Sequence, residues 1–271
     1  MPVQLEHPAG TLTDIREIQL EHPPGTLTRL GEIQLEHPDN TITKVFEYRP
    51  PTLLVSRIVS FQYPIIDIYN LDTRTSSQTV SLANQNNRPG ALGLGGIRRF
   101  EDSVFTLQRG VLYSYTLDLG YVSSLSVSGT INNTFIGVSA TRLYFVVEQS
   151  NILVYNRSGQ AVASENISLA ITATSNAAVY NSEIYYIPGR HQDGTVINVY
   201  SLSGTLSRTI TIPSGRYTQI SVTSNRIYTI LTGTGVTRSL RVFDHSGNRQ
   251  TSEEFQISNP SGRIVGLEVL E

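Results

Sequence analysis

The sequence predicts an all-β fold built from repeated units, and two observations support this. A short apolar strand that ends in an aromatic residue and a polar turn recurs along most of the chain, most plainly at residues 152–159 (ILVYNRSG). The repeat is also regular, with steps of 46, 40, 45 and 43 residues between Tyr69, Tyr115, Tyr155, Tyr200 and Phe243. A period in the low forties that is filled with short strands is typical of a β-propeller, in which each repeat forms one four-stranded blade.

Each repeat contains further short β-rich segments around its aromatic residue. We interpret three of them as first strands of a blade, at residues 135–139, 177–180 and 219–223. Second strands are expected to begin at residues 104–105, 143–144, 184–185 and 227–228, where an aliphatic residue precedes an aromatic one. The turn aromatic then closes the third strand. Ser/Thr-rich segments such as residues 161–169 and 206–212 are expected to form the half-solvated outer strand.

The first blade lacks a first strand near the start of the repeats. Residues 53–60, 65–69 and 76–82 supply its other three strands. The missing strand is expected at the far end, where residues 263–269 (RIVGLEV) follow at the spacing of the next repeat. A C-terminal strand that completes the N-terminal blade removes the free edges of the ring. The sequence therefore predicts a five-bladed propeller that is closed in this way.

Composition excludes several classes of partner. Charged residues make up 15% of the chain and the formal net charge is -2, so no basic field is present to bind nucleic acid or an anionic membrane surface. The absence of cysteine excludes disulfides and thiolate metal sites. No signal peptide and no apolar run of membrane-spanning length is found, which predicts a soluble protein without membrane insertion. We expect no cofactor.

The first 48 residues form an arm of three 15-residue units, at residues 3–17, 18–32 and 33–47. The first and second units share ten positions, and the second and third share nine. Within each unit, two alternating segments flank a Pro-containing turn, which predicts a small β-hairpin or an extended peptide. Residues 49–51 (Arg-Pro-Pro) interrupt the β-pattern, so we place the propeller at residues 49–271.

Two interpretations of the arm remain open, because a hairpin of this size is marginal alone in water. The units can pair with each other or pack on the propeller. Alternatively, they are docking motifs for equivalent sites on a symmetric or repetitive protein partner. The candidate docking residues are Leu5, Glu6, His7, Pro8, Leu20, Glu21, His22, Pro23, Leu35, Glu36, His37 and Pro38. Their histidines are 15 residues apart, a spacing that argues against a metal site.

No catalytic constellation is evident. A glycoside-cleaving propeller needs two carboxylates that converge on the central channel, and the four first strands identified above contain only Glu268. His191 and His245 lie near no G-x-S-x-G motif. The glycine-rich residues 84–96 are followed by a strand at Ile97 rather than by the helix that a phosphate cradle requires. The sequence therefore predicts a protein that is not an enzyme.

The turns at residues 155–159 (YNRSG), 200–204 (YSLSG) and 243–247 (FDHSG) resemble those of NHL-type β-propellers. The resemblance covers residues 52–271 and implies the fold and a tendency toward binding, but no functional residue. We expect a structural or interaction protein that its arm anchors to a repetitive assembly. The composition is similar to that of bacteriophage virion and tail proteins. The alternative is a lectin-like module that binds surface glycans through Tyr and Arg at the blade loops.

Overall fold

The computed structural model describes residues 19–22, 26–29, 32–36, 42–47, 50–58, 64–81, 94–108, 110–127, 134–146, 151–169, 176–188, 194–232, 238–257 and 263–271. The chain divides into two units, residues 1–50 and residues 51–271, and each is described by itself. Within the described ranges, no helix has the length and hydrophobicity needed to cross a bilayer.

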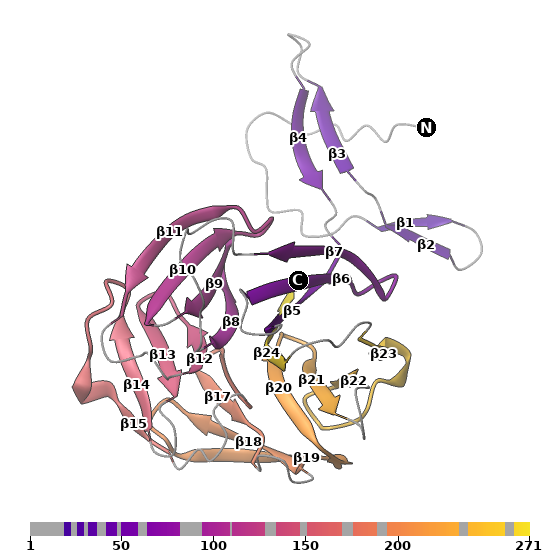
Figure 1. Ribbon diagram of the computed structural model, residues 1–271. Coiled ribbons are helices and arrows are strands. Elements are labelled where there is room, and N and C mark those ends of the chain that lie inside the picture. Colours follow the sequence, from indigo (N-terminus) through magenta and orange to yellow (C-terminus); the bar gives the residue numbers. More distant parts are fainter. Residues whose placement is uncertain are drawn as a thin grey trace, which may run out of the picture. The chain divides into compact units, whose positions relative to one another are not determined.

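Two antiparallel β-hairpins form the described part of the first unit. β1 (Gln19–His22) pairs with β2 (Thr26–Arg29), and β3 (Glu32–Glu36) pairs with β4 (Ile42–Glu47). Each hairpin is a separate two-stranded sheet (Figure 1). The hairpins are the second and third repeat units, which confirms the hairpin prediction for both. The first unit, residues 3–17, lies outside the described residues.

The two hairpins share one register. Three successive residue pairs of the first hairpin recur 15 residues later in the second. The pair Gln19–Arg29 corresponds to Gln34–Lys44, the pair Leu20–Thr28 to Leu35–Thr43, and the pair Glu21–Leu27 to Glu36–Ile42. Register is determined by the residue pattern and by the turn that joins the strands. The 15-residue repeat is therefore a unit of backbone structure as well as of sequence.

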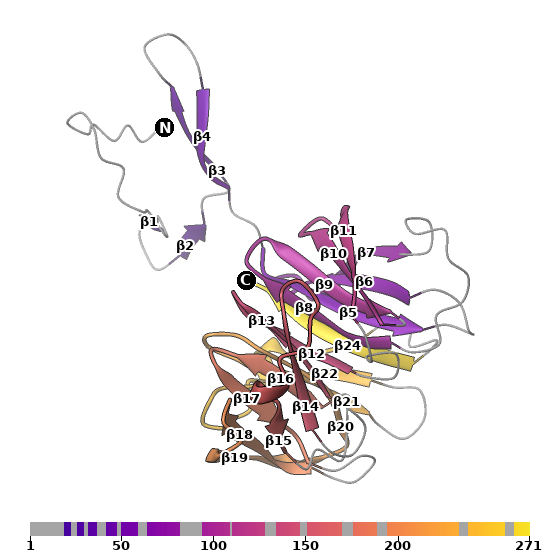
Figure 2. The ribbon, with the colours of Figure 1, turned by 90° about the vertical axis from the view of Figure 1, so that its left-hand side faces the viewer.

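The second unit is a five-bladed β-propeller, which confirms the predicted fold (Figures 1 and 2). From the channel outward, blade one is β24 (Arg263–Leu270), β5 (Thr52–Ile58), β6 (Pro64–Asn70) and β7 (Thr75–Ser81). Blade two is β8 (Leu94–Phe100), β9 (Ser103–Gln108), β10 (Val111–Thr116) and β11 (Tyr121–Ser126). Blade three is β12 (Thr134–Val138), β13 (Arg142–Val146), β14 (Asn151–Asn156) and β15 (Ile167–Ser168).

The remaining two blades follow the same antiparallel order. Blade four is β16 (Ala177–Tyr180), β17 (Glu183–Tyr186), β18 (Gly194–Ser201) and β19 (Leu206–Gly215). Blade five is β20 (Tyr217–Val222), β21 (Ile227–Thr232), β22 (Arg238–Phe243) and β23 (Phe255–Gln256). The first strands contact one another in the cyclic order β24, β8, β12, β16 and β20, and so enclose the channel.

The ring closes through the C-terminal strand, as the sequence predicts. β24 pairs with β5 along its whole length, from Arg263 opposite Ile58 to Leu270 opposite Thr52. Apolar residues of both strands, Leu53 and Leu267 among them, are buried in the cluster that joins blades one and five. The first blade is therefore assembled from the two ends of the propeller sequence.

The residue after each turn aromatic caps the turn that follows the third strand. Asn70 Oδ1 accepts hydrogen bonds from the backbone N–H groups of Asp72 (2.9 Å) and Thr73 (3.0 Å). In the other four blades, the residue after the turn aromatic likewise accepts a hydrogen bond from a backbone N–H of the turn through its side-chain oxygen. These residues are Thr116, Asn156, Ser201 and Asp244. Short polar side chains are favoured in turns because they bond to nearby backbone groups. This explains why a polar residue recurs directly after the aromatic.

The turn aromatics fill the spaces between blades. Tyr69, Tyr115, Tyr155 and Phe243 are at most 4% exposed, whereas Tyr200 is only partly buried. Tyr155, for example, lies in one apolar cluster with Phe105 of the preceding blade. Among the described residues, five such clusters each join two neighbouring blades. The propeller core is therefore a ring of interfaces rather than a single centre.

The outer strand of blade three is shorter than the sequence predicts. Of residues 161–169, Ala161 forms a single bridge with Tyr155, and only Ile167 and Ser168 form a strand, β15, which pairs with β14. A 3-10 turn, η2 (Ala163–Glu165), precedes this strand. Glu165 accepts two hydrogen bonds of 2.6 Å from the Arg142 guanidinium. The ion pair thus joins the bend to the start of β13. Blade five has the same arrangement between Glu253 and Arg226.

Part of the glycine-rich segment has a packing role. Gly96 lies at a bulge in β8 with φ +77°, and a Cβ there would lie 2.1 Å from the backbone oxygen of Phe135 in β12. Only glycine fits both the conformation and the space. Residues 84–93 of this segment lie outside the described residues.

Candidate functional site

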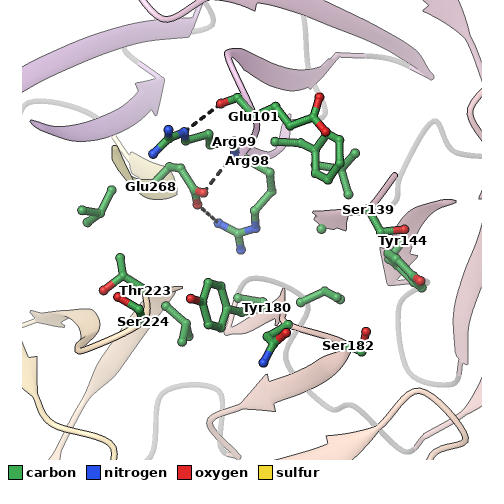
Figure 3. Close-up of a pocket in the computed structure, with 18 of the residues that line it drawn as sticks. Arg98, Arg99, Glu101, Ser139, Tyr144, Tyr180, Ser182, Thr223, Ser224 and Glu268 are labelled. Atoms are coloured by element: carbon green, nitrogen blue, oxygen red, sulfur yellow. Dashed lines mark hydrogen bonds and ion pairs between the residues drawn. The ribbon is translucent and has the colours of Figure 1, made fainter. Parts of the chain in front are cut away.

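The carboxyl ends of the five first strands surround a cavity of about 650 Å³, which we call the channel cavity (Figure 3). Its walls come from β8, β12, β16, β20 and β24 and from the turns that lead to the second strands. Because each blade contributes one strand to the ring, residues that are far apart in sequence converge here.

Arg98 of β8 occupies the centre of this convergence. Its Nε donates to the carbonyl oxygen of Ile136 in blade three at 2.9 Å, and its Nη2 donates to that of Ala177 in blade four at 2.8 Å. Its Nη1 donates to Leu267 O in blade one at 2.8 Å. Arg98 is 4% exposed, and burial lowers the pKa of its guanidinium. A guanidinium presents its donors in a fixed fork, which suits contacts to several strands at once.

Glu268 of β24 completes the network. Its carboxylate lies 3.4 Å from Arg98 Nη1, accepts the backbone N–H of Arg99 at 3.0 Å and accepts Ser221 Oγ of blade five at 3.3 Å. Burial raises the pKa of the Glu268 carboxyl, and the positive charge of Arg98 opposes this rise. We refer to Arg98 and Glu268 as the channel pair. Through it and Ser221, all five blades are connected by side-chain hydrogen bonds.

The channel pair explains why Glu268 is the one carboxylate on the first strands. A carboxyl group with a raised pKa in a cavity is a candidate general acid on chemical grounds. Here, however, both carboxylate oxygens are engaged by protein donors from neighbouring blades. A structural role in joining the blades accounts for these contacts.

Two further carboxylate residues border the cavity. Glu101 follows β8 with φ 51°, and Glu271 follows β24; both are exposed. Arg99 lies between them, and its guanidinium donates to the backbone oxygens of Glu101 at 2.9 Å and Glu271 at 2.5 Å. The mouth of the cavity therefore carries acidic side chains beside an arginine that is engaged with backbone.

The rest of the wall combines neutral polar residues with apolar ones such as Val138, Val179, Leu202, Val222 and Val269. The turns of blades three, four and five contribute Ser139, Thr141, Asn181, Ser182, Thr223 and Ser224. Asn181 and Ser182 have positive φ values of 47° and 62°, as a tight hairpin turn requires. Tyr180, at the end of β16, adds a half-buried aromatic ring. Phe100 and Tyr144 also line the cavity, which thus combines hydroxyl and amide groups with aromatic and aliphatic surface.

Sequence reasoning missed Arg98 because only four of the five first strands were assigned to the channel. The segment at Ile97 was recognised as a strand, yet it is the first strand of blade two. The repeat itself contains the missing signal, since a first strand is due before each second strand. Adding it would have placed the adjacent arginines at positions 98 and 99 on the channel.

The structure places the predicted docking residues only in part. Leu20, Glu21 and His22 lie in β1, and Leu35 and Glu36 lie in β3. The other seven lie outside the described residues: Leu5, Glu6, His7, Pro8, Pro23, His37 and Pro38. Their docking role stays a prediction.

Two other sequence-based interpretations concern ligand groups. No cluster of three or more metal-ligating side chains is found among the residues that the structure describes. His191 and Asp193 lie outside those residues. His245 Nε2 is 3.0 Å from the backbone oxygen of Thr223, and its ring meets that of Tyr185 edge to face. His245 therefore packs between blades.

Comparisons with known proteins identify no specific relative. No family model and no curated protein matches the sequence. The structure resembles a solved protein of unknown function from Bacteroides caccae, with a TM-score of 0.43 and 9% identity over 82% of this chain and 99% of that chain. It also resembles a chain of a nidogen/laminin complex, with a TM-score of 0.48 and 9% identity over 81% of this chain and 98% of that chain.

A third similar structure is a glutaminyl cyclase from Myxococcus xanthus, with a TM-score of 0.43 and 13% identity over 65% of this chain and 69% of that chain. Likenesses at this level of identity say nothing about activity, and they favour neither an enzyme nor a binding protein.

Proposed function

We propose that this protein is a non-enzymatic structural or interaction protein, anchored by its repeated arm to a symmetric or repetitive protein assembly. In this proposal residues 1–48 are the docking arm, and residues 49–271 are a propeller that the assembly displays. The observation that supports it best is the shared register of the two described hairpins, Gln19–Arg29 and Gln34–Lys44 being corresponding pairs. Repeat units that bind equivalent sites on a partner are expected to share both their sequence and their strand register.

The sheet composition of the arm supports docking over internal pairing. β1–β2 and β3–β4 are separate sheets, and neither joins the other in a four-stranded sheet. A two-stranded sheet has two edges whose backbone N–H and C=O groups can pair with another strand. A partner that adds its own sheet edge to each hairpin would pair with these groups and bury further surface.

Tandem copies make such docking strong even when each site is weak. Once one unit is bound, the next is held near its site at an effective concentration that is about millimolar for a short linker. The partner would therefore present equivalent sites at a spacing that successive 15-residue units can span. The composition resembles that of virion and tail proteins of bacteriophages, and a phage particle is the assembly that we would test first.

The test compares three forms of the chain during particle assembly in the native host. The forms are the complete chain, a chain that lacks residues 3–47, and a chain in which residues 18–32 are replaced by a Gly/Ser segment of equal length. The armless chain is expected to stay out of the purified particle and the replaced chain to be retained far less. The equal-length replacement controls for spacing. Incorporation of the armless chain at the level of the complete chain would contradict the proposal.

A further inference from the structure

We propose that the channel cavity is a binding site for a neutral, hydroxyl-rich ligand, that is, a saccharide. This site is separate from the arm and does not depend on the docking proposal. The cavity volume of about 650 Å³ lies within the range of roughly 300–1,000 Å³ that is usual for small-molecule sites. Monosaccharides and disaccharides are compatible with this size.

The charged groups of the cavity argue against an anionic ligand. Arg98 donates hydrogen bonds to backbone oxygens of three other blades, and its charge is compensated by Glu268. The guanidinium of Arg99 is engaged with the backbone of Glu101 and Glu271. The carboxylates of these two residues are exposed at the mouth and would repel a phosphate or a carboxylate.

The neutral groups have the character that a saccharide requires. Hydroxyl and amide side chains both donate and accept, and so match the dual character of sugar hydroxyls. Ser182 and Asn181 are exposed in the turn after β16, and Ser224 is exposed in the turn after β20. Figure 3 shows Ser182 and Ser224 among the side chains arranged around the cavity.

Tyr180 supplies the surface on which a sugar ring can stack. It is half-buried, so its position is fixed by packing against the cluster between blades four and five while part of it faces the cavity. The buried turn aromatics cannot take this role, because Tyr69, Tyr115, Tyr155 and Phe243 are enclosed between blades. A lectin site repeated in every blade is thus unsupported, whereas one central site has the necessary groups.

Saturation-transfer NMR on the complete chain tests the proposal. The probes are glucose, galactose, mannose and N-acetylglucosamine, each as monosaccharide and disaccharide, with inorganic phosphate as the anionic probe. At least one saccharide is expected to bind at millimolar concentration, and phosphate is expected not to bind. Binding should persist in the chain that lacks residues 3–47, which separates this proposal from that of the arm.

Substitutions then assign the site. Tyr180→Ala should weaken saccharide binding about tenfold or more, because it removes the stacking surface. Ser182→Ala is the milder variant, which changes an exposed side chain and leaves the packing of β16 in place. Tyr121→Ala is the matched control, since Tyr121 is 46% exposed on the outer strand of blade two. The proposal is overturned if no saccharide binds, if phosphate binds instead, or if neither cavity variant weakens binding.

Discussion

The arm and the propeller are both repetitive, but they repeat different things. Neighbouring arm units share ten or nine of their 15 residues, and the two described hairpins share their register. The blades share only a class of residue at each position, such as an aromatic at the end of the third strand. The difference indicates which contacts each kind of repeat has to make.

Within the propeller, each turn aromatic meets a different neighbour. Tyr155 contacts Phe145 edge to face at 5.3 Å between ring centroids, whereas Tyr69 meets Phe255 at 5.6 Å in a tilted arrangement. Packing of this kind requires volume and apolar surface but no particular residue. Blade sequences are therefore free to diverge. The close identity of the arm units points to contacts that are the same for each unit.

The largest effect is expected from removing the closing strand of the propeller. A chain that ends at Asn259 lacks β24, so the backbone groups of β5 that pair with β24 lose their partners, and the apolar interface between blades one and five is exposed. We expect aggregation or a much lower melting temperature in thermal unfolding. The chain that lacks residues 3–47 is the control, and it should melt like the complete chain. Normal melting of the truncated chain would refute the closure.

Replacing Arg98 tests whether the blades are tied at the centre. Arg98→Met keeps much of the apolar stem but removes the side-chain donor to four backbone oxygens and the positive charge beside Glu268. Breaking a buried ion pair costs about 3 to 5 kcal/mol of unfolding free energy. Arg74→Met, in an exposed turn, should change stability by about 0.5 kcal/mol or less. Equal denaturant midpoints for the two variants would show that the channel pair is dispensable.

The loss of unfolding free energy on replacing a turn aromatic with alanine should increase with the burial of that side chain. Tyr155→Ala removes a side chain enclosed between blades two and three, and about 3 to 5 kcal/mol of unfolding free energy should be lost. Tyr200→Ala should cost less, because Tyr200 is only partly buried. Chemical denaturation of both variants checks the order. Full stability of the Tyr155 variant would mean that the aromatic does not serve the blade interface.

A smaller effect concerns pH. Burial raises the pKa of Glu268, so the protonated carboxyl is favoured in the folded state, and stability falls as pH rises through that pKa. Arg98 opposes this in the native chain. In Arg98→Met this positive charge is absent, so the loss of unfolding free energy relative to the unsubstituted chain should be smaller near pH 4 than near pH 8. The double variant Arg98→Met, Glu268→Gln should lose this pH dependence. A loss of unfolding free energy that does not change with pH would contradict the coupling between Arg98 and Glu268.

Local patterns were sufficient to predict the blades, because an aromatic, its capping residue and its strands all lie within one repeat. They also predicted closure, since residues 263–269 fall at the repeat spacing. They were insufficient for the channel pair, whose contacts join residues that are 38, 79 and 169 positions apart. Such convergence depends on how the ring closes and leaves no local signature.

The outer strands show the same limit on a smaller scale. From the sequence, residues 161–169 are expected to form an extended outer strand. Part of the segment forms a 3-10 turn instead, in which Glu165 pairs with Arg142, 23 residues away. A contact between residues this far apart leaves no signal in the local sequence.

Hydrogen exchange on the free, complete chain tests the central claim most directly. If the arm is a set of docking units without an internal partner, amides from Gln4 to Glu47 should exchange fast, because isolated two-stranded hairpins open readily in water. Amides of the inner propeller strands, such as β12 and β24, should exchange slowly in the same sample. Protection of the arm as strong as that of these strands would contradict the account, since it would mean that the arm is already satisfied within the chain.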